Sequence, residues 1–235
     1  MSVPAAVGLA GAMMAAATGT ALAQSRTFEV AGPFTGVDIA SGLDADVTVG
    51  GAVSVTAEAR DTEYLDDLRV EVRDGRLHAW IERDILDFRF GDQRRVHLHV
   101  TAPHLDFIQA SGGSNVTAKG LAGELVEANA SGGADLDVSA VKATNLVASG
   151  SSGSDLRLAG TCENARFDVS SGSDLKAEDL QCKNVAVSAT SGSDAEVFAS
   201  VSVDANASSG GDIEVRGNPG TARQNAASGG EIKIR

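Results

Sequence analysis

Two histidines, His97 and His99, are the side chains whose type and spacing most readily suggest chemistry. They lie in the stretch Val-His-Leu-His-Val at residues 96–100, whose alternation predicts a β-strand. A strand points every second side chain to one face, so the pair could hold a metal ion together with a third ligand. No Cys, His or acidic companion is evident from the sequence. We therefore interpret the pair as solvent-facing and predict no metal site, and we interpret the isolated His78 and His104 as surface residues.

A second set of candidates consists of acidic or amide residues that follow nearly identical corners. SSGSDL stands at residues 151–156 and again at 170–175, and looser copies begin at residues 111, 131, 190, 209 and 228. A fixed period of this kind indicates a repeat architecture. The anchors of the corners are separated by 20, 20, 19, 20, 18 and 19 residues: Asn115, Asp135, Asp155, Asp174, Asp194, Asp212 and Glu231.

Stacked corners would set one carboxylate per coil in a ladder, which makes calcium binding an alternative to a structural role. Calcium takes about six to eight oxygen ligands, more than single carboxylates supply. Neighbouring carboxylates about 4.8 Å apart in water repel by only about 1 kcal/mol, so a solvated ladder needs no metal. We therefore predict structural corners. Gly153 and Gly172 would adopt positive φ, and Ser and Asp side chains would accept hydrogen bonds from turn amides.

Short strands are the elements that must position these corners. After each corner, apolar residues occupy every second place, as in Asp155-Leu156-Arg157-Leu158, and this is typical of a strand with one buried face. The first inward row is Val116, Leu136, Leu156, Leu175, Ala195, Ile213 and Ile232. The second inward row is Ala118, Val138, Leu158, Ala177, Val197, Val215 and Ile234. The outward row between them is Thr117, Asp137, Arg157, Lys176, Glu196, Glu214 and Lys233.

Strands that recur about every 20 residues with no helix between them exclude βαβ units, and β-propeller blades need about 40 residues. We predict an all-β fold, a parallel β-helix in which stacked coils bury the faces that one coil cannot bury alone. The repeat coils would span residues 109–235. Residues 27–108 would be a less regular β segment of the same domain. That segment would contain a helical turn near 61–68, a hairpin at Asp74-Gly75 and an exposed loop at 84–94.

The chain has two cysteines, Cys162 and Cys182, which lie one period apart in matching C-x-N contexts. Stacking would bring them side by side, with Cα atoms about 4.8 Å apart, inside the range that a disulfide needs. We predict that they form a disulfide. The alternative is two free thiols in one ladder, because directly paired parallel strands are awkward for this bond.

The first 23 residues are apolar and uncharged and end in Ala21-Leu22-Ala23, the shape of a secretory cleavage site, although no Lys or Arg lies near the start. We predict a signal peptide at residues 1–23 and export to the periplasm or the cell surface; an uncleaved membrane anchor is the alternative. The net charge of −13 would then belong to the remaining chain, which would repel nucleic acid.

The chain also resembles a known family in the order of its motifs. A G-V-x-I-x-S-G segment begins at Gly36, Asp74-Gly75 stands between two predicted strands, Ala102-Pro103 ends another, and serial S-G-[GS]-x-[DN]-[VLI] corners follow. This order, over about residues 28–235, resembles the putative auto-transporter adhesin head GIN domain family of exported bacterial proteins. The resemblance implies a single-stranded, right-handed β-helix at the cell envelope. The cysteine pair and the apolar loop near Phe88 depart from the family pattern without changing this assignment.

We predict a non-catalytic envelope or surface module, either adhesin-like or a scaffold, with no cofactor and no catalytic residues. Its ligand would be an envelope component, a glycan or a protein, and coils could self-associate through the solenoid ends. A glycan-acting lyase or hydrolase is the alternative, because many β-helices bind glycans along a lateral groove. Such enzymes use clustered carboxylates. Acyl transfer is excluded, because His104 is the last histidine and precedes every repeat corner.

Overall fold

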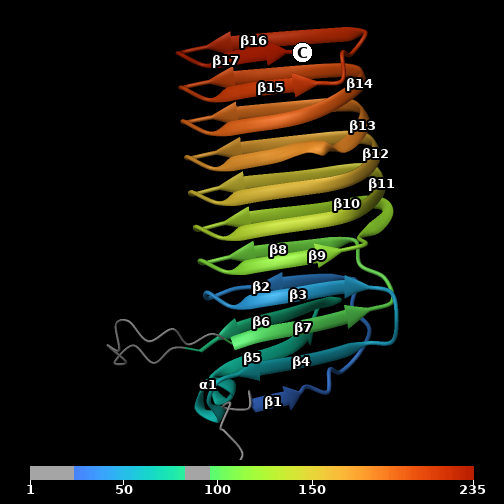
Figure 1. The fold of residues 1–235 in the computed structure, drawn as a ribbon, viewed down its shortest axis with the longest axis vertical. Coiled ribbons are helices and arrows are strands. Elements are labelled where there is room, and N and C mark those ends of the chain that lie inside the picture. Colours follow the sequence, from blue (N-terminus) through green and yellow to red (C-terminus); the bar gives the residue numbers. More distant parts are fainter. Residues whose placement is uncertain (1–23, 83–95) are drawn as a thin grey trace, which may run out of the picture.

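The computed structural model describes residues 24–82 and 96–235, and most of these residues lie in β-strands. The strands wind into a β-solenoid in which successive coils stack along one axis (Figure 1). The all-β solenoid expected from the repeat is thus confirmed. The signal peptide expected at residues 1–23 and the loop expected at 84–94 lie outside the described residues.

Parallel strands build the repeat part of the solenoid, and they pair in the register that the repeat predicts. Leu156 lies opposite Leu136 on one side and opposite Leu175 on the other. The strands are β8 (Phe107–Ser111), β9 (Asn115–Lys119), β10 (Ala122–Ser131), β11 (Asp135–Ser151), β12 (Asp155–Ser170), β13 (Asp174–Thr190), β14 (Asp194–Ser208), β15 (Asp212–Arg216), β16 (Thr221–Ala227) and β17 (Glu231–Ile234).

Each long strand changes direction near its middle, so that one coil forms two facing walls (Figure 1). Where β11 pairs with β12, the register shifts between Val138 and Val141. Gly160 lies in this bend with φ of 142°, and a Cβ there would lie 2.3 Å from the Val141 carbonyl oxygen. Only glycine fits so close to the neighbouring backbone, so the bend depends on this residue.

The core is the narrow space between the two walls. Both inward rows are buried from Val116 and Ala118 to Ile213 and Val215, with exposed fractions of 3% or less. In the last coil, Ile232 and Ile234 are only partly buried, because β17 pairs with β15 alone among the described strands. Arg157 and most of the outward row are exposed. The predicted alternation therefore places the side chains correctly.

The N-terminal part of the solenoid does not follow chain order. Its strands are β1 (Gln24–Thr27), β2 (Gly36–Ile39), β3 (Asp44–Val49), β4 (Ser54–Ala59), β5 (Leu68–Arg73), β6 (Arg76–Ile81) and β7 (Val96–Ala102). β2 pairs with β6 and β8, and β3 pairs with β7 and β9, all in parallel. The coil of β2 and β3 is therefore inserted between a coil that comes later in the chain and the first repeat coil.

Antiparallel strands and a short helix complete the end of the solenoid opposite β17 (Figure 1). The expected hairpin is β5 and β6, joined by Asp74 and Gly75 with φ of 52° and 74°. The expected helical turn is α1 (Thr62–Asp66), whose Leu65 is buried. In the described part of the chain, no helix has the length and apolar character needed to span a bilayer.

Candidate functional site

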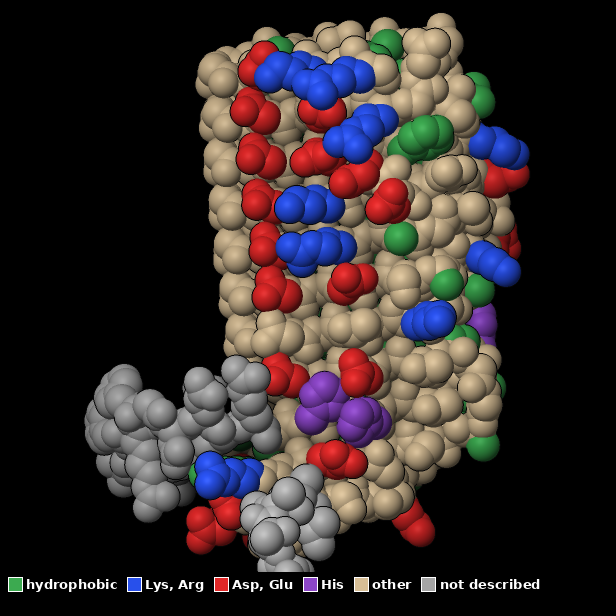
Figure 2. Space-filling view, in the orientation of Figure 1, with side chains coloured by type: hydrophobic (Ala, Val, Ile, Leu, Met, Phe, Trp, Pro, Cys, Tyr) green, Lys and Arg blue, Asp and Glu red, His purple; other side chains and the backbone are tan. Residues whose placement is uncertain are grey.

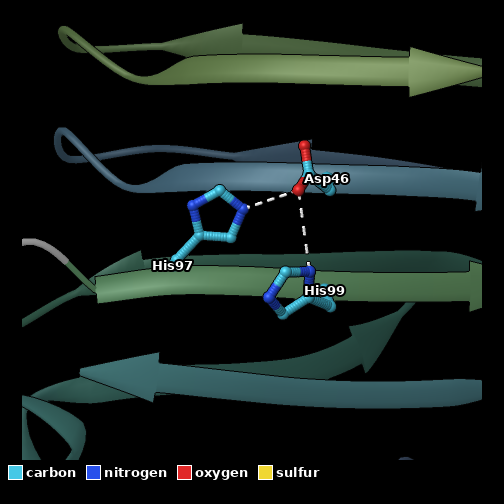
Figure 3. A group of neighbouring side chains, drawn as sticks. All are labelled: Asp46, His97 and His99. Atoms are coloured by element: carbon cyan, nitrogen blue, oxygen red, sulfur yellow. Dashed lines mark hydrogen bonds and ion pairs between the residues drawn. The ribbon is translucent and has the colours of Figure 1, made fainter. Parts of the chain in front are cut away.

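The insertion of β3 beside β7 brings Asp46 to the two histidines. Asp46 lies opposite His99 in the parallel register, and Asp44 lies opposite His97. The Asp46 Oδ2 atom is 2.8 Å from His97 Nε2 and 3.7 Å from His99 Nδ1 (Figure 3). All three ligand atoms lie within 4.8 Å of one another. Asp46 is thus the acidic companion that could not be identified from the sequence.

The three side chains lie on the surface and are about half exposed, with exposed fractions of 41% for His97, 43% for His99 and 51% for Asp46. The two imidazole rings stack loosely, with centroids 4.6 Å apart. This agrees with the interpretation of the pair as solvent-facing. Two imidazole nitrogens and one carboxylate oxygen also form a recognised ligand set for divalent transition metals.

Further carboxylates flank the histidines on both sides. On β4, Glu58 lies opposite His97 in the antiparallel register, so it extends from the same face of the sheet. Asp44 lies opposite His97 on β3. In Figure 2 the histidines accordingly lie between acidic side chains. The cluster Asp46–His97–His99 therefore has an acidic surround that favours a bound cation.

The other histidines, expected to be isolated, also lie near single carboxylates. His78 Nδ1 is 3.3 Å from Asp38 Oδ2, and His104 Nε2 is 3.8 Å from Asp106 Oδ2. Each forms one such ion pair, and in the described part of the chain neither belongs to a group of three possible metal ligands. Among the described residues, the grouping of three possible metal ligands occurs only at Asp46, His97 and His99.

The corner anchors form one column along the solenoid. The register aligns Asn115, Asp135, Asp155, Asp174, Asp194, Asp212 and Glu231 in successive coils. Asp44 also aligns with Asn115 and accepts a hydrogen bond of 2.8 Å from its amide. Acidic side chains therefore follow one another in this corner column (Figure 2). Beside it lies a mixed column, which is the outward row from Thr117 to Lys233 and carries charges of both signs. Ser41-Gly42 ends the G-V-x-I-x-S-G segment and precedes Asp44 as Ser-Gly precedes the later anchors, which is the signal in the sequence for its place in this column.

One carboxyl of the corner column, Asp194, has a shifted pKa. Partial desolvation, and then the charges of Asp174 and Asp212, raise the pKa of this carboxyl above its ordinary value. In the same region, Asp194, Glu196, Asp212, Glu214, Glu231 and Lys233 line a shallow hollow between the two columns. Arg216 forms ion pairs with Glu196 at 3.0 Å and with Glu214 at 3.3 Å, which partly neutralises the hollow.

Where a serine precedes the anchor, as Ser154 and Ser193 do, the serine caps the corner rather than the acid. Ser154 is fully buried, and its hydroxyl accepts a hydrogen bond from the Ser151 amide and donates one to the Ala130 carbonyl. Ser193 accepts from the Thr190 amide in the same way. Gly153 and Gly172 adopt the expected positive φ, at 71° and 70°. The prediction named serine and aspartate together, and the hydrogen bonds identify the inward serine as the capping group.

The disulfide between Cys162 and Cys182 is confirmed. The two residues are register partners in β12 and β13, and their Cα atoms are 4.5 Å apart. Both cysteines are buried, with exposed fractions of 7% and 1%. The bond therefore staples two adjacent coils from within the core.

An asparagine ladder lies two positions beyond the cysteines, on the outer surface. Asn164 donates to Asn145 Oδ1 at 3.0 Å, and Asn184 donates to Asn164 Oδ1 at 3.1 Å. Ser202 continues the ladder by donating to Asn184 Oδ1 at 2.8 Å. The recurrence of C-x-N was visible in the sequence, but only the fold shows that the amides bond to one another.

The chain was compared with known families and solved structures. The family model described as "Putative auto-transporter adhesin, head GIN domain" matches residues 33–219. The structure is similar to a putative adhesin from Bacteroides fragilis, with a TM-score of 0.79, 20% identity, and coverage of 91% of this chain and 97% of that one. It is also similar to a putative lipid binding protein from Parabacteroides distasonis, with a TM-score of 0.66, 17% identity, and coverage of 92% and 98%. No curated protein matches.

Proposed function

Because the chain belongs to the putative auto-transporter adhesin, head GIN domain family, we propose that it is a non-catalytic binding or scaffold module of the cell envelope or cell surface. The observation that carries this proposal is the regular lateral face. In both the corner column and the mixed column beside it, outward side chains of successive coils lie in register (Figure 2). A stiff face of this kind suits an extended ligand, which many repeat proteins bind along their length.

Export of the module is supported by its disulfide. A structural bond between Cys162 and Cys182 persists in oxidising compartments such as the periplasm or the cell surface. The A-x-A sequence before Gln24 supports the same assignment. Intact cells treated with an external protease distinguish the two locations. Digestion of the chain supports surface display, and protection until the outer envelope is opened supports a periplasmic scaffold.

The ligand of the proposed module would be neutral or cationic. The net charge of −13 and the acidic corner column repel nucleic acid and anionic surfaces. The purified chain should therefore be tested against neutral glycans, basic peptides and neutral vesicles, the last because one structural neighbour bears the name of a putative lipid binding protein. Saturable binding to one class, weakened by reversing the charge of Asp155 and Asp174, would support an adhesin-like role. Failure to bind any class would favour the scaffold role.

Self-association through the solenoid end is part of this proposal. The last described coil, β16 and β17, hydrogen-bonds on one side only, to β14 and β15. An open strand edge can pair with another chain. Light scattering should then give a mass above 23.8 kDa that rises with concentration and returns to the monomer value in Ile232→Lys. A monomer at all concentrations would refute end-to-end pairing.

A glycan-acting enzyme remains the second candidate, and the hollow at Asp194 is the observation that favours it. A carboxyl with a raised pKa beside further carboxyl groups resembles the acid and base pair of glycosidases. Release of reducing ends from envelope glycans, abolished in Asp194→Asn, would establish this activity. Equal release by wild type and Asp194→Asn would exclude this hollow as its source.

A further inference from the structure

We propose that Asp46, His97 and His99 form a binding site for one divalent transition-metal ion of the zinc class. The site is independent of the proposed binding or scaffold function and of the corner column. It combines three observations: a ligand set of two imidazoles and one carboxylate, mutual distances that suit one ion, and a rigid two-strand base.

The distances between the ligand atoms match those around a metal ion. Zinc lies about 2.0–2.2 Å from nitrogen and oxygen ligands, so two ligands in a tetrahedral site are about 3.3 Å apart. The Asp46 oxygen lies 2.8 Å from one imidazole nitrogen and 3.7 Å from the other, on either side of this value. The two imidazole nitrogens lie within 4.8 Å of each other, so rotations of the exposed side chains would bring the three atoms around one ion.

The ligand types select the metal. Neutral imidazole binds zinc, copper and nickel, whereas calcium and magnesium take mostly oxygen ligands. Two of the three groups here are imidazoles, so the site discriminates against calcium and magnesium. Asp44 and Glu58, the register partners of His97, add negative charge next to the site without crowding it. This charge raises the local concentration of cations.

The base of the site is rigid, because every ligand alternates with buried side chains. On β7, His97 and His99 lie between Val96, Leu98 and Val100, which have exposed fractions of 3%, 0% and 1%. On β3, Asp46 lies between Ala45 and Val47, with fractions of 2% and 1%. Such packing fixes the backbone of the two neighbouring strands from which the three ligands extend (Figure 3).

Metal binding would stabilise the contact between the inserted coil of β2 and β3 and the coil of β6 and β7. Asp46 lies on β3 and the histidines lie on β7, so an ion would bridge two coils that are 51 residues apart in the chain. Because the unfolded chain does not hold these groups together, a metal that binds the folded state raises its stability. A rise in the melting temperature with zinc therefore accompanies binding at this site.

Calorimetric titration of the full chain with zinc chloride tests the proposal, using protein without an affinity tag. We expect one ion per chain, with affinity reduced more than about tenfold in His97→Gln, His99→Gln and Asp46→Asn, since loss of a ligand costs at least as much as loss of an outer-shell partner. His78→Gln is the matched control, because it removes a histidine that pairs with a carboxylate, Asp38, on the neighbouring strand pair but has no second histidine in its group. It should bind as the wild type does.

Zinc-edge X-ray absorption supplies a second readout, in which imidazole scattering should appear in the wild type and His78→Gln. Melting in the absence of metal checks that each variant folds; one that does not is set aside, and the remaining two still decide. Binding that is equal in the wild type and the ligand variants overturns the proposal. So does zinc binding that is absent in the wild type, or that calcium displaces at equal concentration.

Discussion

Asp46 and His97 are 51 residues apart in the chain, yet the Asp46 carboxylate lies 2.8 Å from the His97 imidazole. Their contact exists because the coil of β2 and β3 is inserted between the coil of β6 and β7 and the coil of β8 and β9. The repeat coils above are stacked in chain order, with partners about one period apart. The solenoid therefore has a repetitive part, in which paired strands are close in the sequence, and an N-terminal end, in which paired strands are distant in the sequence.

The alternation of inward and outward side chains predicts opposite results for two neighbouring substitutions. Leu156 has an exposed fraction of 1%, so Leu156→Asp would bury an unpaired charge and should abolish the folding transition. Arg157→Asp changes an exposed residue and should shift the free energy of unfolding by about 1 kcal/mol or less. Urea unfolding measures both. Equal damage from the two substitutions would contradict the register.

The disulfide should contribute measurably to stability. Closing a loop of 20 residues stabilises by about 3 kcal/mol in the chain-entropy model. The double substitution Cys162→Ala and Cys182→Ala should lower the free energy of unfolding by about this amount, with the fold retained. Thiol titration of the exported wild type should give no free thiol, and two free thiols per chain would refute the bond in the native protein.

A buried corner serine should contribute more to the free energy of unfolding than the exposed serine in the same corner. Ser154→Ala leaves the partly buried Ser151 amide without its side-chain acceptor and should cost about 1–2 kcal/mol. Ala134 occupies the same place in an adjacent coil, so the substitution is sterically tolerated. Ser152→Gly is the control, because Ser152 is exposed and has φ of 59°, which glycine adopts freely. A cost for Ser152→Gly as large as that for Ser154→Ala would contradict this capping role.

Acidification should relieve the crowding at Asp194. Its pKa is raised by desolvation and by Asp174 and Asp212, so the folded state binds this proton more tightly than the unfolded state does. The repulsion is present in full above the folded pKa, and stability rises as the pH falls from there toward the ordinary value of 3.8. Asp194→Asn should therefore stabilise the chain at neutral pH, and this gain should shrink on acidification.

Glu163 provides the contrast for that experiment. A hydrogen bond of 2.7 Å from Lys183, and its charge, lower the pKa of Glu163 below 4.5. Its contribution to stability is present above that value and is lost as the pH falls through the folded pKa. Glu163→Gln should slightly destabilise at neutral pH. Unfolding free energies that change in the same direction for both variants would contradict the assigned causes.

Calcium should leave the thermal midpoint unchanged. The corner column places one carboxylate per coil in solvent, which falls short of the ligand number that calcium requires. Melting curves recorded with millimolar calcium and with chelator should coincide for the wild type. A large rise in the midpoint with calcium, lost in the double variant Asp155→Asn and Asp174→Asn, would show that the column is a cation site.

Much of the repeat part could be predicted because each residue pairs with the residue one period before or after it in the sequence. A period of about 20 residues with apolar residues at alternate places leaves one way to bury the inward rows, and this fixes the ladder partners. The opposition of Leu136 and Leu156, and the side-by-side position of Cys162 and Cys182, follow from the period, whereas the bond between the cysteines is shown by the structure. The column of Asp135, Asp155 and Asp174 also follows from the period.

The order of stacking at the N-terminal end was decided only by the tertiary structure. The segment from β2 to β7 has no repeat to fix its partners, and its strands could pair in several orders at similar local cost. Burial of β3 between β7 and β9 selects one order, and that choice sets Asp46 beside His97 and His99. The sequence determined which faces of the strands carry these side chains. Because strand pairing between distant segments depends on packing of the whole core, only the folded chain determined that they meet.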